Sequence, residues 1–461
     1  MKDKGRKFVL KDVVAPEMDF AKCEVELTVA TMNQRKEAVI NKMNERNVQA
    51  LIVYADLEHG SNFEYLVGFL PRFEEALLVL HNSGEAYLVL GNENLNKSSK
   101  ARIKNIPIHA PHFSLPNQPM DTNETFTEIL RKTQIEGKKI GIVGWKNFTS
   151  KIEDNKKMFD IPQFIVESLK EICGSDALTN ECTLFIGEKG VRRVNNANEI
   201  AHYEFGSSLA SDCMQDAINN MQVGVSEFEI ADKLNRYGQW NSVVTIATFG
   251  PRFVNANMYP SSRKLAFGDT VSLTIGYKGG LSSRAGYAVR DECELNNEVM
   301  DYVSKVCIPY FNAIVTLLES SRCGISGGEI YDEINDVLPQ DDYKWGLCPG
   351  HLVADEEWMS SPIYKNSTEC LESGMIFQTD IIPQVSGYTG VSVESTYAIA
   401  DEKLREQIKM EYPELWNRIK KRQEYIREVT GVKIGDEILP MAAALSFYKP
   451  LLLGKKALVL E

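Results

Sequence analysis

The sequence is short of positive charge. Its 461 residues include 51 lysines and arginines against 64 aspartates and glutamates, which gives a net charge of −13 at pH 7. Such a surface repels nucleic acids and anionic membranes on average, so binding to either would need a local basic patch. The densest basic run, Arg418–Arg422, lies among apolar residues at helical spacing, which predicts the solvated face of a helix. We therefore expect neither a nucleic-acid nor a membrane partner.

Paired cysteines and long apolar runs are also missing. The nine cysteines form no C-x-x-C pair and are odd in number, which favours reduced thiols over a disulfide framework. The charged N-terminus lacks the apolar core of a signal peptide. The most apolar stretch near the end, residues 440–448, is far shorter than the roughly 18 residues of a membrane span. These absences predict a cytoplasmic protein.

Two domains are indicated by the pattern along the chain. Apolar spacing predicts a helix over residues 32–47, and continuous apolar runs predict buried strands that alternate with polar turns. These strands are expected over residues 50–54, 76–80, 85–90 and 140–143. The segment 187–196 is polar and contains glycine, so it reads as a linker. We expect one α/β domain over residues 1–187 and a second domain over residues 196–461.

The second domain contains an internal repeat. Residues 224–235 recur, with several identities, as residues 324–335 at an offset of one hundred. Both copies begin with glycine and place serine three residues before glutamate, as in a capping box at the start of a helix. Asn196 and Glu199 predict another capping box. A duplicated helix–helix–sheet unit implies a pseudo-symmetric sheet covered by helices, with a ligand site between its halves.

A hairpin with unusual chemistry lies between the two copies. Over residues 270–275, threonine and serine alternate with valine, leucine and isoleucine, which predicts a strand with one polar and one apolar face. A turn at Gly279 and Gly280 leads to a second short strand that contains Arg284. Serines at 282 and 283 have no histidine nearby in the sequence, so a nucleophile is less favoured than a structural role. The polar face therefore carries hydroxyl groups where an enzyme would be expected to carry carboxylates.

Several short segments of the second domain stand out, in this order: Leu265-Ala-Phe-Gly-Asp269, Pro349-Gly-His351, Leu371-Glu-Ser-Gly-Met375 and Gly390-Val-Ser-Val-Glu394. The first domain contains Tyr54-Ala-Asp-Leu-Glu-His59 and Phe73-Glu-Glu-Ala-Leu-Leu-Val79. By these segments, nearly the whole chain resembles the "pita-bread" superfamily of aminopeptidase P, prolidase, methionine aminopeptidase and creatinase. This resemblance implies an α/β (α+β) protein with a creatinase/prolidase-like N-terminal domain and a pseudo-symmetric pita-bread domain.

The resemblance also implies a degenerate metal site. Metallopeptidases of this superfamily hold two divalent ions with Asp, Asp, His, Glu and Glu. With a one-residue gap in the hairpin turn, these positions fall on Thr274, Arg284, His351, Asp380 and Glu394. Two carboxylates are lost and a cation is gained, so a dinuclear centre lacks electrostatic support. We expect no cofactor, or at most one divalent ion, and Arg284 paired with Asp380 or Glu394.

The metal-free relative creatinase indicates how catalysis could persist. Its catalytic histidine falls on Asn257, which cannot exchange a proton near neutral pH, so the creatinase reaction itself is not expected. A second family histidine falls on Trp358, and Tyr287 replaces a family arginine. The resemblance assigns catalysis to His351, Asp380 and Glu394. It assigns substrate binding to Arg284, Asn257, Tyr287 and Trp358.

Three functions stay open at this point. The first is a metal-independent hydrolase of a C–N bond, or a diverged non-peptidase, with His351 as proton carrier. The second is an inactive pseudoenzyme that binds a peptide or small molecule. The third is an active dinuclear Xaa-Pro peptidase, which would require a different hairpin alignment. By resemblance we expect a homodimer. We expect its ligand to be a small molecule or a peptide.

Overall fold

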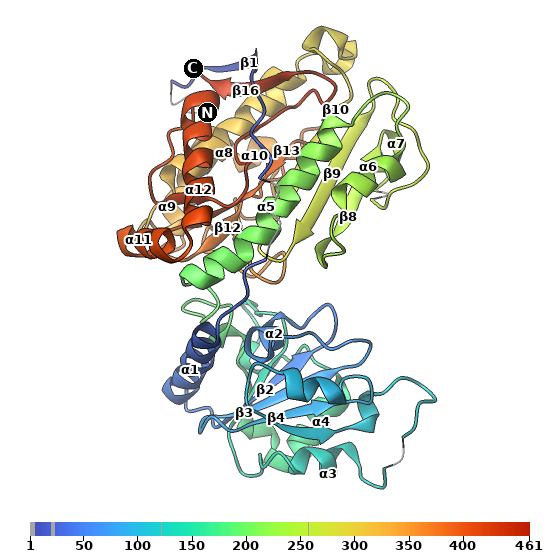
Figure 1. Cartoon of the computed structure of the whole chain (residues 1–461), viewed down its shortest axis with the longest axis vertical. Coiled ribbons are helices and arrows are strands. Elements are labelled where there is room, and N and C mark those ends of the chain that lie inside the picture. The colour runs from blue at the N-terminus through green and yellow to red at the C-terminus, as the bar shows by residue number, and fades with distance from the viewer. Residues whose placement is uncertain (1–4, 20–23, 121, 257) are drawn as a thin grey trace. The chain divides into compact units, whose positions relative to one another are not determined.

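The computed structural model describes residues 5–19, 24–120, 122–256 and 258–461. The chain divides into two compact units (Figure 1). One is Leu27–Arg193, and the other combines Met1–Glu26 with Val194–Glu461. The division falls inside the polar segment 187–196. The start of the chain, however, was placed by sequence within the range 1–187, whereas the structure assigns it to the C-terminal unit.

The unit Leu27–Arg193 is built on a six-stranded mixed sheet with the strand order β5-β4-β3-β2-β6-β7. The strands are β2 (Ala50–Ala55), β3 (Ala76–His81), β4 (Ala86–Leu90), β5 (Ile106–His109), β6 (Ile140–Val143) and β7 (Leu178–Asn180). The helices are α1 (Val29–Glu45), α2 (Ser61–Val67), α3 (Phe126–Arg131) and α4 (Gln163–Cys173). The predicted helix and the four predicted strands are thus confirmed within a few residues.

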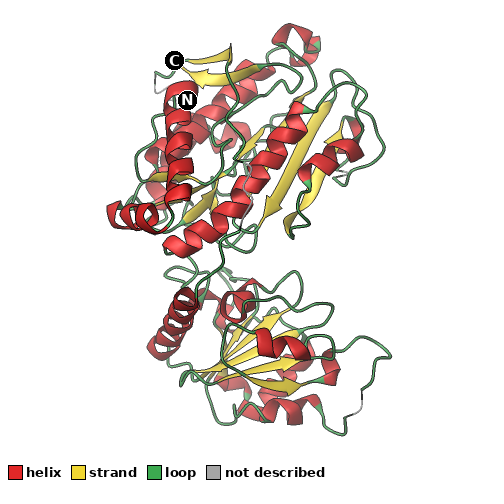
Figure 2. Cartoon of the chain, viewed as in Figure 1, coloured by secondary structure: helices red, strands yellow, loops and turns green. Residues whose placement is uncertain are grey.

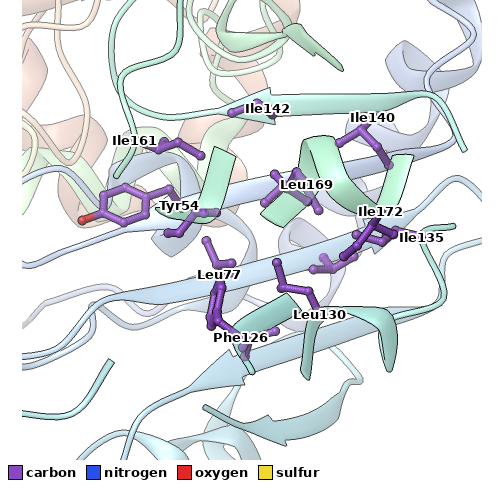
Figure 3. Close-up of a cluster of buried hydrophobic side chains, with 14 of the residues drawn as sticks. Tyr54, Leu77, Phe126, Leu130, Ile135, Ile140, Ile142, Ile161, Leu169 and Ile172 are labelled. Atoms are coloured by element: carbon purple, nitrogen blue, oxygen red, sulfur yellow. The ribbon is translucent and has the colours of Figure 1, made fainter. Parts of the chain in front are cut away.

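The core of this unit lies between the sheet and two of its helices. Figure 3 shows side chains of α3 and α4, among them Leu130 and Leu169, pointing toward Leu77 and Ile142 of the strands. All four side chains are fully buried. Because β2 and β3 are buried along their whole length, their sequences are continuous apolar runs rather than alternating apolar and polar residues.

The C-terminal unit contains two four-stranded sheets covered by helices (Figure 2). The first has the order β13-β10-β9-β8, and the second has the order β11-β12-β14-β15. The first sheet comprises β8 (Asn241–Phe249), β9 (Thr270–Tyr277), β10 (Gly280–Tyr287) and β13 (Ser392–Glu394). The second comprises β11 (His351–Leu352), β12 (Ile376–Gln378), β14 (Thr396–Ile399) and β15 (Ile438–Pro440). Mixed α/β architecture of this kind agrees with the expected fold class.

The internal repeat appears as two helix pairs. The long helices α5 (Ala197–Asn219) and α8 (Ile308–Ser320) are followed by α6 (Glu227–Leu234) and α9 (Gly327–Val337). The predicted capping boxes at the starts of α5, α6 and α9 all form. Both copies of the repeat serine also make an isolated bridge to a later segment, Ser226 to Lys264 and Ser326 to Cys370. The halves therefore share topology as well as sequence.

Shorter elements and the two ends of the chain complete the unit. They are α7 (Pro251–Val254), α10 (Gln340–Tyr343), α11 (Glu402–Glu411) and α12 (Pro413–Tyr425). Strand β1 (Phe8–Asp12) pairs antiparallel with β16 (Lys456–Leu460), which explains why the start of the chain belongs here. No helix among the described residues is long and apolar enough to cross a bilayer.

The basic run on α12 forms a solvated face only in part, which corrects the sequence prediction: Lys420 and Lys421 are exposed, but Arg418 and Arg422 turn inward. Arg422 is only 3% exposed and donates to the carboxylates of Asp19 and Glu204. Arg418 donates to both oxygens of the same Glu204. Because Glu204 is itself buried in α5, the two arginines turn inward to neutralise it.

Candidate functional site

The first part of the candidate site is a row of polar side chains across three strands. Thr274 of β9 lies opposite Ser283 of β10, and Ser283 lies opposite Glu394 of β13. Residues that face each other in antiparallel strands point to the same side of the sheet. The Thr274 hydroxyl donates a hydrogen bond to the Ser283 hydroxyl at 2.9 Å. Two hydroxyl groups that bond to each other therefore lie beside the Glu394 carboxyl.

The second part comes from the other sheet. His351 begins β11, and Asp380 follows β12 by two residues. The Nε2 atom of His351 lies 3.6 Å from Oδ2 of Asp380, and Nδ1 lies 3.3 Å from the Leu352 carbonyl oxygen. The indole ring of Trp358 stacks on the imidazole ring at a centroid distance of 4.1 Å. The structure thus brings together three predicted residues, with the half-exposed Trp358 over a histidine that is only 1% exposed.

A third carboxyl group, Glu357, belongs to the same site and was missed by the sequence analysis. Burial, together with the charge of Asp380, raises the pKa of Glu357 to about 7. The Asp355-Glu356-Glu357 run shortly after His351 was the available signal. Acidic runs are usually solvated, however, and nothing local distinguishes one that turns inward.

Burial dominates the electrostatics of the site. It raises the pKa of Asp380, and burial followed by the charge of Asp380 raises the pKa of Glu394 well above its ordinary value. Burial lowers the pKa of His351 to about 4, so the imidazole is neutral near pH 7. Among the described residues, no lysine or arginine side chain forms an ion pair with Glu357, Asp380 or Glu394. The Oδ1 atom of Asp380 is buried without a hydrogen-bond partner in the described chain.

Arg284 does not pair with these carboxyl groups, which corrects the prediction that it would bond to Asp380 or Glu394. Its register partner on β9 is Leu273, whose side chain packs against α5. The guanidinium is fully buried on that helix-covered face and donates to the backbone carbonyls of Ser283, Glu394 and Ala444. Ser283, one residue earlier, faces the site instead.

Two other residues, Tyr287 and Asn257, were predicted to bind substrate. The Tyr287 hydroxyl accepts a hydrogen bond from the Thr389 backbone N–H at 3.0 Å, and its ring packs edge-on against Tyr302. Its proposed role toward a substrate stays a prediction. Asn257 lies outside the described residues.

The donor groups do not fit the dinuclear metal centre that the fold family implies. Thr274 and Ser283 supply hydroxyls on the hairpin, and these satisfy each other. Hydroxyls carry no charge to balance two divalent ions, whereas carboxylates would. Within residues 5–19, 24–120, 122–256 and 258–461, no three His, Cys, Asp or Glu side chains converge as a metal-binding group.

Comparison with known proteins agrees with this architecture. Residues 202–401 match the profile of metallopeptidase family M24. An uncharacterized peptidase of Staphylococcus haemolyticus is 21% identical over 59% of this chain and 80% of its own length. An Xaa-Pro dipeptidase from Bacillus anthracis aligns with a TM-score of 0.60 at 16% identity, over 81% of this chain and 96% of its own. A prolidase from Thermococcus sibiricus aligns with a TM-score of 0.62 at 19% identity, over 80% and 95%.

These matches identify the fold of the chain and a family profile over residues 202–401. The profile covers the part of the chain that carries Thr274, Ser283, His351, Asp380 and Glu394, and the structural matches span both units. Residues 202–401 therefore resemble metallopeptidase family M24, and the chain shares the fold of the solved Xaa-Pro dipeptidase and prolidase.

Proposed function

We propose that this protein binds a small cationic nitrogen compound at the Glu357–Asp380–Glu394 site and hydrolyses a C–N bond in it without a dinuclear metal centre. The observation that carries the proposal is the grouping of three shielded carboxyl groups with no cationic side chain paired to them among the described residues. A buried carboxylate without a counter-charge is costly, and a bound cation would remove that cost. Amidines, guanidines and amines carry such a charge.

The protonation states support a hydrolytic role. The neutral His351 imidazole can accept a proton from water, while a carboxyl group with a raised pKa can still donate one near neutral pH. In the proposed step, water adds its hydroxyl to the carbon as the C–N bond breaks. The leaving nitrogen takes a proton from the carboxyl group, and His351 passes the proton from water to the resulting carboxylate.

A second candidate is a pseudoenzyme that binds the same ligand without turnover. It is favoured by the hydroxyl pair of Thr274 and Ser283, because that pair occupies hairpin positions where the catalytic relatives are charged. A dinuclear Xaa-Pro peptidase, as the printed names of the relatives would suggest, is the least favoured function because of the same two residues.

The deciding experiment is turnover and binding with chelator-treated protein. The probes are a small amidine, an alkylguanidine and an Xaa-Pro dipeptide, and metal content is measured by mass spectrometry after incubation with manganese or zinc. Hydrolysis of a cationic probe in chelator, lost in Glu394→Gln and kept in Glu298→Gln at an exposed position, supports the proposal. Binding without hydrolysis favours the pseudoenzyme. Two bound ions with metal-dependent dipeptide hydrolysis would overturn the proposal.

The cellular setting and assembly are also proposed. The described cysteines are all free thiols, which supports a reducing, cytoplasmic setting. A homodimer rests on the family resemblance, and a monomer in sedimentation velocity would contradict it.

A further inference from the structure

A separate cavity lies on the opposite face of the sheet from the candidate site. Its volume is about 210 Å³, and it is lined by side chains of α5, of β10 and of the chain ends, all within the C-terminal unit. Met214, Ile218 and Phe447 give it an apolar wall. Arg284 also lines it, because alternation along β10 turns Arg284 away from Ser283 and toward α5.

Every charged side chain that lines this cavity is cationic. They are Arg284, Lys449 and Lys455, and the described lining residues include no aspartate or glutamate. Burial lowers the pKa of Arg284 to about 10, and burial is also what lowers the pKa of Lys449. The charge of Glu394, on the other face of the sheet, offsets only part of the effect of burial on Arg284, and no described carboxylate lines the cavity itself.

Hydrogen-bond donors also remain for a ligand. A guanidinium has five N–H donors, and Arg284 uses three of them on backbone carbonyls, so two are left. Gln215, which lines the cavity and is only 5% exposed, has a buried side-chain Nε2 with no hydrogen-bond partner in the described chain. An unpaired buried donor is uncommon in a folded protein and indicates an acceptor that has yet to be supplied.

The size and lining define the class of ligand. A cavity of about 150 Å³ with apolar walls holds benzene, so about 210 Å³ accommodates roughly eight non-hydrogen atoms. The donors and charges require an anion, and the apolar wall requires a hydrocarbon body. Inorganic anions satisfy only the first requirement.

We propose that this cavity is a binding site for a small organic carboxylate, with the carboxylate at Arg284, Gln215 and Lys449 and the hydrocarbon body against Met214 and Phe447. The site is distinct from the candidate active site, since the sheet separates the two. Arg284 also holds the carbonyl of Glu394, so the two sites share one strand pair.

The proposal is tested by isothermal titration calorimetry of the full chain with hexanoate. One equivalent is expected to bind, with the affinity reduced at least tenfold in Lys449→Gln and restored in Lys449→Arg. Lys421→Gln removes the same charge at an exposed position of α12 and is expected to bind as the wild type does. Ala15→Trp adds bulk at an exposed residue of the cavity rim and is expected to abolish binding without disturbing the core.

Two ligand controls separate the chemistry. Hexylamine has a similar body but the opposite charge and is expected not to bind, while inorganic phosphate is expected to bind at least tenfold more weakly than hexanoate. Absence of hexanoate binding, equal binding in Ala15→Trp, or equal binding of hexylamine or phosphate would each overturn the proposal. Circular dichroism spectra that match the wild type establish that each variant is folded.

Discussion

Replacing Glu357 by glutamine tests whether the carboxyl groups of the candidate site are electrostatically strained. The pKa of Glu357 rises from 4.5 to about 7 on folding. The folded chain then binds more protons than the unfolded chain between these values, so stability falls as pH rises from 4.5 to 7. Since one pKa unit corresponds to ~1.36 kcal/mol, the 2.5-unit rise to about 7 costs about 3 kcal/mol once the pH exceeds 7.

The Glu357→Gln variant has no such group, so its stability relative to the wild type should depend on pH. Near pH 4 the two proteins should differ little, and near pH 8 the variant should be more stable by up to about 3 kcal/mol. His351 acts in the opposite direction, because its lowered pKa makes folding less favourable as pH falls below 6.5. That contribution is common to both proteins and cancels in the difference.

Urea unfolding followed by tryptophan fluorescence measures this difference. Trp240, Trp345, Trp358 and Trp416 lie in the C-terminal unit, so the signal mainly reports the unit that contains Glu357. Glu298→Gln removes a carboxyl group at an exposed position and serves as the control. A stability difference between Glu357→Gln and wild type that is the same near pH 4 and near pH 8 would refute the reasoning.

Three other substitutions probe separate contacts. Arg284→Met leaves three buried carbonyls without their donor, so a loss of about 3 kcal/mol or more is expected in urea unfolding, and a loss below about 1 kcal/mol would contradict the bonding described here. Trp358→Ala exposes the His351 ring, whose pKa should rise from about 4 toward its ordinary value in an NMR titration; an unchanged pKa would show that other groups shield it. Arg422→Met leaves the buried Glu204 with one partner and should cost about 3–5 kcal/mol, most of which the double variant with Glu204→Met should recover.

Local sequence signals predicted much of the fold. Capping boxes and apolar periodicity depend on residues a few positions apart, and they correctly marked the starts of α5, α6 and α9. The pairing of β1 with β16 joins residues from opposite ends of the chain, and no local pattern encodes it. The partners of Arg422 are also distant in sequence, so they could not be predicted. The sequence of α12 has the same polar face whether that face contacts water or Glu204.

The candidate site could be predicted from the sequence only in part. His351, Asp380 and Glu394 follow distinct motifs and lie near one another in the structure, whereas Arg284 was assigned to the wrong face. The error arose in the hairpin turn, where the comparison with the family's ligand positions assumed a gap of one residue. Because side chains alternate along a strand with a period of two, a shift of one residue exchanges the two faces of the hairpin. Ser283, rather than Arg284, is the residue that lies opposite Thr274 and Glu394.

That alternation also separates charge across the sheet. On one face, Glu394 belongs to a group of carboxyls that burial keeps partly protonated, and on the other, Arg284 belongs to a group of cations. Arg284 lowers the pKa of Glu394, but by less than burial and the charge of Asp380 raise it, so the cations behind the sheet relieve the carboxyls in front of it only in part. Each face consequently retains its own unmet charge. A cationic ligand in front and an anionic ligand behind would each lower the free energy of the folded chain, and neither would need to displace a side chain already paired with the opposite charge.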